Sequence, residues 1–229
     1  MYKKYTYQTK SGTDAIIQAL SLLDSKRVII PTYTCQDILR AVKQSNCEYL
    51  IVDCGLDLQI DVDEVIKNQH LYDTVIIPHM FGIRANVEVI RKYTSLKIIE
   101  DLSQCHGLSN LGQSADIVVS STNKSKWIDL KGGGFLFTDK TLTLPTVDFD
   151  PFIPTIQKSL EKRKLLAYEI KEAGIDLIGE ESSYLRAMYF TKEASTRFPY
   201  IPLHILENRF GSYKVNSYIN KVNWISIFV

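Results

Sequence analysis

Two kinds of hydrophobic pattern alternate along the first 140 residues of the chain. Short runs rich in isoleucine and valine predict β-strands, because β-branched residues fit a pleated surface. Between these runs, apolar residues recur every three or four positions, which predicts amphipathic helices. Asp61 begins one helix as its N-cap, and Glu64 three residues later completes a capping box. The predicted strands are 27–31, 49–52, 74–78, 97–100, 116–120 and 134–138, and the predicted helices are 14–23, 36–43, 61–67 and 86–93.

The predicted strands lack regular alternation of apolar and polar residues. Such strands are typical of a mostly parallel sheet that is buried on both faces. Because strands and helices alternate along the chain, we predict an α/β fold with three layers, in which helices cover both faces of the sheet. This large domain is expected to span residues 1–150.

The pattern changes after residue 139, where Pro145, Pro151 and Pro154 indicate a loop or linker. A long amphipathic helix is predicted to follow, and the tail beyond it is rich in aromatic residues. We predict that residues 151–229 form a reduced C-terminal α+β subdomain. Its predicted elements are the helix 156–173 and the short β-like segments 184–190, 197–203 and 224–229.

The composition of the 229 residues is that of a globular protein, with 45% hydrophobic and 23% charged residues and a formal net charge of +1. Proteins that bind nucleic acids generally carry a basic excess, so no nucleic-acid partner is expected. No apolar run approaches the roughly 20 residues that span a bilayer, and the N-terminus lacks the apolar core of a signal peptide. We therefore predict a soluble, cytoplasmic protein with no membrane partner.

Four cysteines stand in apolar or strand-like surroundings and show no C-x-x-C spacing. This arrangement favours reduced thiols over a disulfide framework or a zinc site, and no metal site is predicted. The four are Cys35, Cys47, Cys54 and Cys105.

An acidic motif follows the predicted strand 97–100. Asp101 lies just past the end of this strand, and Gln104 follows in the same loop. In an open α/β sheet, ligands bind in the crevice at the carboxyl ends of the strands. Taken alone, Asp101 is more simply a solvated loop acid, so the motif indicates a site only together with other features.

A hydroxyl-rich turn that carries lysines follows the predicted strand 116–120. Ser121, Lys124 and Lys126 lie in this turn, and three consecutive glycines lead into the strand 134–138. Glycines permit positive φ angles and the close approach of another backbone. The alternative is a hairpin-like surface turn with solvated lysines. No Gly-Lys-Ser/Thr sequence follows the glycines, so the segment is not a P-loop.

Ser11, Gly12 and Thr13 stand directly before the first predicted helix. A glycine flanked by hydroxyls at a helix N-terminus offers N–H groups and the positive end of the helix dipole to a phosphate. The simpler alternative is an ordinary N-cap. Together, the three clusters supply an amine, an acid and an anion site, which is the set of groups that pyridoxal phosphate (PLP) needs.

The order and spacing of these motifs resemble the DegT/StrS-type family of sugar-nucleotide aminotransferases, which are PLP enzymes of the aspartate aminotransferase fold. The resemblance covers about residues 10–138 and implies the large domain of fold-type I PLP transferases. The residues that carry it are Ser11-Gly12-Thr13, Pro31-Thr32-Tyr33-Thr34, Val52-Asp53, Ile60-Asp61, His79-Met80-Phe81-Gly82, Glu100-Asp101, Gln104-Cys105-His106-Gly107, Asp116, Ser121 and Lys126.

The resemblance implies that Lys126 binds PLP covalently and moves the proton between substrate carbon and cofactor carbon. Lys124 is the competing candidate, but Lys126 has the family's spacing to Ser121. The resemblance also implies that Asp101 pairs with the protonated ring nitrogen, without which the ring is a poorer electron sink.

The remaining cofactor contacts are also implied by the resemblance. Gln104 would form a hydrogen bond near the phenolic oxygen of the ring. Ser121, together with the backbone of Gly12 and Thr13, would hold the phosphate.

The activity implied is transfer of an amino group to a keto-sugar, nucleotide-linked as in the family, with glutamate as the amino donor. The dehydratase branch of the family has a histidine in place of the lysine, so Lys126 favours transamination. Family members are dimers with active sites at the subunit interface, and a homodimer is therefore expected.

The chain departs from the family pattern at several positions. Cys35 stands where an aromatic residue normally stacks on the cofactor ring, and Gly132 stands where a glutamate is usual. Between Thr138 and the helix around Arg163, a family segment is missing that carries an asparagine for the partner's phosphate site, and the N-terminal arm is nearly absent.

Two alternative functions stay open because of these departures. One is a remnant of the PLP fold that binds cofactor weakly or not at all and acts as a binding or regulatory protein. The other is a different PLP reaction, such as an elimination or an aldol cleavage, because the surroundings of the ring decide which bond breaks.

Overall fold

The structure is a computed structural model that describes residues 2–55, 57–124, 126–172, 186–191 and 223–228. A seven-stranded sheet forms its main body, with the strand order β1-β7-β6-β5-β4-β2-β3. Strand β7 runs antiparallel to both of its neighbours, and all other neighbouring pairs are parallel. The strands are β1 (Tyr5–Thr9), β2 (Arg27–Pro31), β3 (Glu48–Val52), β4 (Thr74–Pro78), β5 (Lys97–Asp101), β6 (Ile117–Ser121) and β7 (Gly134–Thr138).

The strands send alternate side chains into two separate hydrophobic cores. In β4, for example, Val75 and Ile77 enter one core, whereas Ile76 between them enters the other. All three side chains are fully buried. This two-sided burial explains why the strands read as continuous apolar runs, since successive residues face opposite sides of the sheet.

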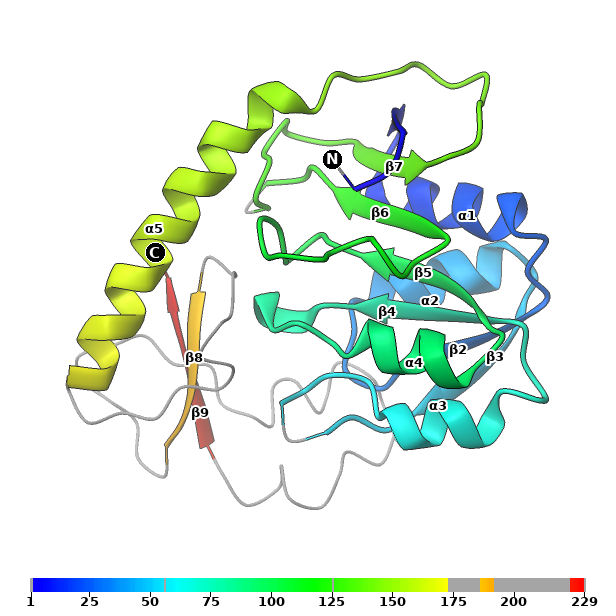
Figure 1. Cartoon of the computed structure of the whole chain (residues 1–229), viewed down its shortest axis with the longest axis horizontal. Helices are drawn as coiled ribbons and strands as arrows, with labels where there is room; N and C mark the ends of the chain where they lie inside the picture. Colours follow the sequence, from blue (N-terminus) through cyan, green and yellow to red (C-terminus); the bar gives the residue numbers. More distant parts are fainter. Residues whose placement is uncertain (1, 56, 125, 173–185, 192–222, 229) are drawn as a thin grey trace.

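Helices cover both faces of the sheet, so the predicted three-layer α/β fold is confirmed (Figure 1). Helices α1 and α2 pack on one core, and α3 and α4 pack on the other. Asp61 caps α3 as predicted, because its carboxylate accepts a hydrogen bond from the backbone N–H of Glu64 at 3.1 Å. The helices are α1 (Gly12–Leu22), α2 (Gln36–Gln44), α3 (Val62–Asn68) and α4 (Val87–Tyr93), with short 3-10 turns at Met80–Gly82 and Asp150–Phe152.

Strand β1 is an element that the sequence analysis missed. It lies at the edge of the sheet and pairs antiparallel with β7, so that Tyr5 faces Thr138. Its outer side is covered by the chain that follows β7, because Gln8 donates its backbone N–H to the carbonyl of Pro145 at 2.9 Å. The segment around Pro145, predicted as a loop, therefore protects an edge strand from pairing with other chains.

Beyond residue 150, helix α5 (Ile153–Glu172) begins three residues earlier than the prediction of 156. Strands β8 (Arg186–Thr191) and β9 (Asn223–Phe228) form an antiparallel pair that matches two of the predicted β-like segments. The third predicted segment, 197–203, lies outside the described residues. The division into domains at residue 150 stays a prediction.

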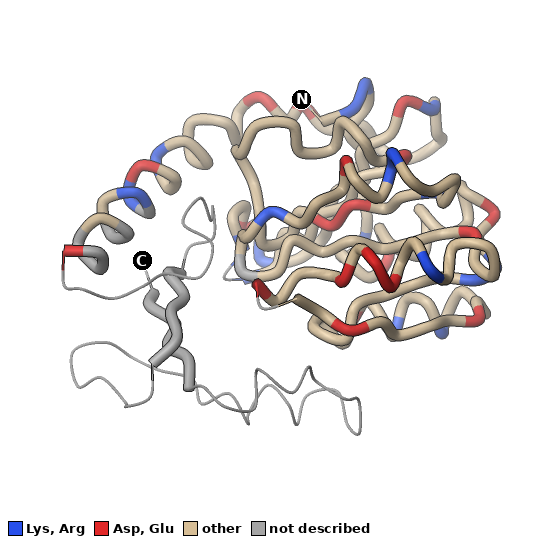
Figure 2. The backbone as a smooth tube through the Cα atoms, turned by 60° about the horizontal axis from the view of Figure 1, so that its bottom comes forward, with Lys and Arg blue, Asp and Glu red and all other residues tan. Residues whose placement is uncertain are grey.

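The charged residues of both signs are interspersed over the sheet domain rather than gathered by sign (Figure 2). In the part of the chain that the structure describes, no helix combines the length and apolar character needed to cross a membrane.

Candidate functional site

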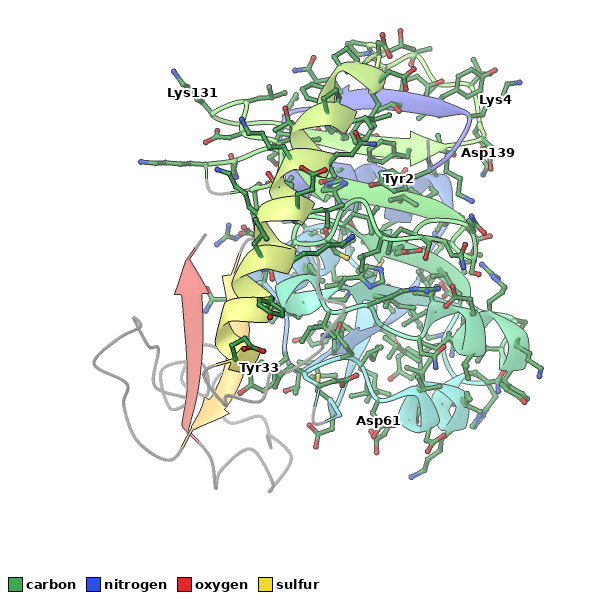
Figure 3. The ribbon with its side chains drawn as sticks, turned by 60° about the vertical axis from the view of Figure 1, so that its left-hand side comes forward. Tyr2, Lys4, Tyr33, Asp61, Lys131 and Asp139 are labelled. Atoms are coloured by element: carbon green, nitrogen blue, oxygen red, sulfur yellow. The ribbon has the colours of Figure 1, made fainter. Side chains whose placement is uncertain are left out.

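A pocket lies at the carboxyl ends of the parallel strands, where the loops after β1, β2, β4, β5 and β6 meet. Figure 3 shows Lys131, in the loop after β6, at the opposite end of the sheet from Lys4 and Asp139. All six site residues predicted from the sequence line this pocket: Gly12, Thr13, Asp101, Gln104, Ser121 and Lys126. The structure thus brings together residues from three separate sequence motifs.

Helix α1 begins at the pocket. The Ser11 hydroxyl accepts a hydrogen bond from the backbone N–H of Asp14 at 3.0 Å, so Ser11 is an N-cap, as the simpler alternative held. Gly12 and Thr13 were expected to precede the helix, but they form its first turn. Because first-turn N–H groups have no acceptor within a helix, these two remain available to an anion in the pocket.

Glycines allow α1, β6 and β7 to meet closely at the edge of the pocket. A Cβ atom on Gly12 would lie 2.8 Å from the Cβ of Ser121, and one on Gly134 would lie 2.7 Å from the backbone of Ser11. Gly133, which has a φ of +90°, forms an isolated β-bridge with Ser11. These observations give the glycines at the start of β7 the structural role expected from the sequence, because a side chain would displace the backbone at Gly134 and would strain the positive φ at Gly133.

The loop after β5 connects the acid to the serine at the end of β6. Asp101 is 7% exposed, and its Oδ1 accepts a hydrogen bond from the backbone N–H of Ser103 at 2.8 Å. The Ser103 hydroxyl in turn accepts from the backbone N–H of Ser121 at 2.9 Å. Ser103 also lines the pocket, although the sequence analysis did not select it.

The loop from β6 to β7 carries both candidate lysines. Thr122 joins the two ends of this loop, since its hydroxyl donates a hydrogen bond to the carbonyl of Gly132 at 2.6 Å. The indole N–H of Trp127 donates to the backbone carbonyl of Gln104 at 3.2 Å, and the Trp127 side chain is buried in the core. Lys126 is half-buried and lines the pocket, whereas Lys124 is exposed and does not line it.

His79 forms part of the pocket wall and is fixed by hydrogen bonds on both ring nitrogens. The backbone N–H of Ala85 donates to its Nδ1 at 2.9 Å, so Nδ1 must carry a lone pair. The proton of the neutral ring is then on Nε2, which donates to the buried Glu100 at 2.8 Å. These two bonds fix the orientation of the His79 ring, and both Glu100 oxygens accept from the backbone N–H of Gly112.

Cys35, which replaces the stacking aromatic residue of the family pattern, lines the pocket beside Ile38. Burial raises the pKa of its thiol, a hydrogen bond from the backbone of Asp37 partly opposes this rise, and the charge of the Asp37 carboxylate adds to it. The charge of Lys126 opposes the rise in pKa and that of Asp101 adds to it, each with a smaller effect. The raised pKa keeps Cys35 as a neutral thiol at neutral pH, which makes it a poor nucleophile.

His106, which belongs to the Gln104-Cys105-His106-Gly107 motif, has a structural role. Its ring is hydrogen-bonded to the hydroxyls of Tyr2 at 2.9 Å and Ser120 at 3.0 Å, and it does not line the pocket. Complete burial, with a smaller effect of His79, lowers its pKa to about 3.

None of the four cysteines forms a disulfide. Burial raises the pKa of Cys54 to about 12, so this thiol is inert at neutral pH. Within the described ranges, no group of three or more His, Cys, Asp or Glu residues is arranged to hold a metal ion.

A family model described as the DegT/DnrJ/EryC1/StrS aminotransferase family matches residues 1–144. A curated relative, the 3-oxo-glucose-6-phosphate:glutamate aminotransferase of Bacillus subtilis (strain 168), is 34% identical over 148 residues. That match covers 61% of this chain but 34% of the relative, so it spans about a third of the relative's length.

Solved structures share the fold. The crystal structure of NtdA from Bacillus subtilis with bound cofactor PMP has a TM-score of 0.71 and 20% identity, covering 99% of this chain and 69% of that one. A GDP-4-keto-6-deoxymannose-3-dehydratase (ColD) mutant with bound GDP-perosamine has a TM-score of 0.74 and 14% identity, covering 99% and 84%. At these identities the likeness confirms the predicted fold and leaves the reaction to be argued from the pocket.

Proposed function

Because the chain belongs to the DegT/DnrJ/EryC1/StrS aminotransferase family, we propose that it is a PLP-dependent enzyme that transfers an amino group to a keto-sugar. The observation that carries this proposal is the convergence of Lys126, Asp101 and the N-terminus of α1 on one pocket. The name of the curated relative supports a sugar acceptor and glutamate as the amino donor.

The donor and acceptor groups of the pocket fit PLP. Lys126 contributes a half-buried amine, and Asp101 contributes a buried carboxylate. The first turn of α1 and the Ser121 hydroxyl contribute donors for a phosphate, and the close contact between Gly12 and Ser121 keeps these donors together. When bound, PLP supplies the electron sink that amino-group transfer requires.

Three residues of the pocket are assigned separate roles toward the cofactor. The Lys126 amine would hold the cofactor covalently and would move a proton at Nζ. Asp101, whose Oδ1 accepts the Ser103 N–H, would pair with the protonated ring nitrogen. Gln104, whose backbone is held by Trp127, is assigned to the phenolic oxygen of the ring.

The proposal also covers the form of the sugar substrate, the oligomeric state and the cellular location. The sugar carries a phosphate, either as a nucleotide-linked sugar, as in the family, or as a sugar phosphate, as in the name of the curated relative. We propose a homodimer, which sedimentation of the purified protein will test. A cytoplasmic location agrees with four cysteines that form no disulfide, since reducing compartments keep thiols free.

The test of the proposed function is covalent trapping of PLP. Borohydride treatment of the PLP-loaded protein should leave a stable adduct, and peptide mass spectrometry should find it on Lys126. Lys126→Ala should lose the adduct, whereas the matched control Lys124→Ala should retain it because Lys124 lies outside the pocket. An adduct on Lys124, or none in the wild type, contradicts the proposal.

Loaded protein should also react with glutamate. A single-turnover assay with excess glutamate should release about one equivalent of 2-oxoglutarate per bound, unreduced PLP, because each PLP takes the amino group of one glutamate. Protein that traps PLP but releases no 2-oxoglutarate would show that a different PLP reaction, or none, takes place.

A further inference from the structure

Two serine hydroxyls at the pocket are held by the same kind of hydrogen bond. The oxygen of Ser103 accepts from the backbone N–H of Ser121 at 2.9 Å. The oxygen of Ser121 accepts from the backbone N–H of Asn123 at 3.4 Å. All three residues line the pocket, so the hydrogen bonds form a short chain along its surface.

This arrangement determines what the hydroxyls offer to a ligand. A backbone N–H only donates, so each serine oxygen uses a lone pair and its own proton must point elsewhere. Among the described residues, neither proton has a protein acceptor. Because both residues line the pocket, both hydroxyl protons are available to a ligand there.

Ser103 is fixed from two directions. Its backbone N–H donates to Asp101 Oδ1 at 2.8 Å, while its hydroxyl oxygen accepts from Ser121. The first bond fixes the backbone of Ser103 and the second restrains its side chain, which reduces the entropy that a ligand contact would otherwise have to overcome.

The donors around Ser103 favour an anionic ligand. A Cβ on Gly12 would lie 3.3 Å from the Ser121 oxygen, so the first turn of α1 lies against the same serine. First-turn N–H groups and the two serine protons are all donors, and a phosphate oxygen is an acceptor that can take several of them.

We propose that Ser103 donates its hydroxyl proton to the phosphate of PLP, next to Ser121. This inference rests on the proposed function and extends it to a residue that the sequence motifs did not indicate. Ser103 thus connects Asp101, which we assign to the ring nitrogen, with Ser121, which we assign to the phosphate.

The test compares two ligands that differ only in the phosphate. Binding of PLP and of pyridoxal is measured by absorbance titration for the wild type and for Ser103→Ala, which removes the hydroxyl but keeps the N–H bond to Asp101. Because a hydrogen bond to a charged group is lost, PLP affinity should fall about tenfold, whereas pyridoxal affinity should change less than about twofold.

Two control variants separate ligand contact from structure. Ser109→Ala changes an exposed serine in the same loop and should leave both affinities unchanged. Ser103→Thr keeps the hydroxyl and should retain PLP affinity within about threefold.

Each outcome bears on the proposal. Equal PLP affinity in wild type and Ser103→Ala overturns it, and so does an equal loss for PLP and pyridoxal, which indicates a structural effect. Wild-type protein that binds no PLP overturns the proposed function, and this inference with it. If only the Ser103 proposal is wrong, the wild-type protein still binds PLP and Ser103→Ala binds it equally well.

Discussion

Gly12 is the residue at which the pocket depends most directly on the absence of a side chain. A Cβ here would lie 2.8 Å from Ser121 Cβ and 3.2 Å from Ser121 Cα. Glycine to alanine in a helix normally stabilises a protein, by about 0.5–1 kcal/mol. At this position we expect the opposite sign for Gly12→Ala, a loss of about 1–3 kcal/mol from overpacking, measured by urea unfolding.

A compensating substitution tests whether contact with Ser121 is the cause. Adding Ser121→Gly to Gly12→Ala removes the Cβ that the alanine meets, so part of the lost stability should return. Should Gly12→Ala prove as stable as the wild type, the close contact between α1 and β6 does not restrict this position.

At the scale of elements, the loop from β6 to β7 places Lys126 because its neighbours are anchored. Trp127 is 4% exposed and its indole N–H holds the Gln104 carbonyl. Trp127→Phe keeps an aromatic ring but leaves that carbonyl without this donor. We expect a loss of about 1 kcal/mol in unfolding free energy and a lower yield of borohydride-trapped PLP, because both loops that we assign to the cofactor loosen.

Ile128→Val is the matched control for this loop. It removes one buried methylene from the same core, which also lowers stability by about 1 kcal/mol, but it affects no hydrogen bond to Gln104. Its trapping yield should equal that of the wild type. Equal yields in Trp127→Phe and Ile128→Val would mean that the indole does not position the site.

Most elements could be predicted from the sequence because their stability is local or follows from simple burial. Strand Thr74–Pro78 is an apolar run that ends at proline, and its predicted bounds are those observed. Strand Tyr5–Thr9 was missed because its tyrosines and threonines give a weak hydrophobic signal. It is a strand because β7, distant in the sequence, offers it a partner.

In the candidate site too, residues with a local sequence signal could be predicted, whereas contacts between distant segments could not. Asp101, Ser121 and Lys126 belong to sequence motifs, so the resemblance indicated them before their proximity was known. Ser103 stands between two of the motif residues, Asp101 and Gln104, yet its contact with Ser121 depends on two strand ends meeting. Sequence spacing carries no information about such a contact.

At the scale of the whole molecule, the buried His106 connects the N-terminus to the centre of the sheet. Its ring is hydrogen-bonded to the hydroxyl of Tyr2 on one side and to the hydroxyl of Ser120 in β6 on the other. The ring also packs in an aromatic cluster with Phe149. Burial of the ring lowers its pKa from the ordinary value of 6.5 to about 3. The folded molecule therefore holds this histidine neutral at any pH where the protein is ordinarily handled.

This shift predicts how the stability of the molecule depends on pH. Between about pH 6.5 and pH 3 the unfolded chain binds a proton on His106 and the folded chain does not. The contribution of His106 to stability is thus complete above about pH 6.5 and falls as the pH drops through this window, by at most about 1.4 kcal/mol per pH unit. Urea unfolding from pH 7 to pH 4.5 should show the decline.

His106→Gln isolates the contribution of this residue, because glutamine does not titrate and still offers hydrogen bonds to Tyr2 and Ser120. The variant should be less stable than the wild type at pH 7, since the ring also packs in the core. Its stability should fall less steeply toward pH 4.5, so the two curves converge. Carboxylates titrate equally in both proteins, and parallel curves would mean that His106 takes up its proton equally well in the folded and unfolded chain.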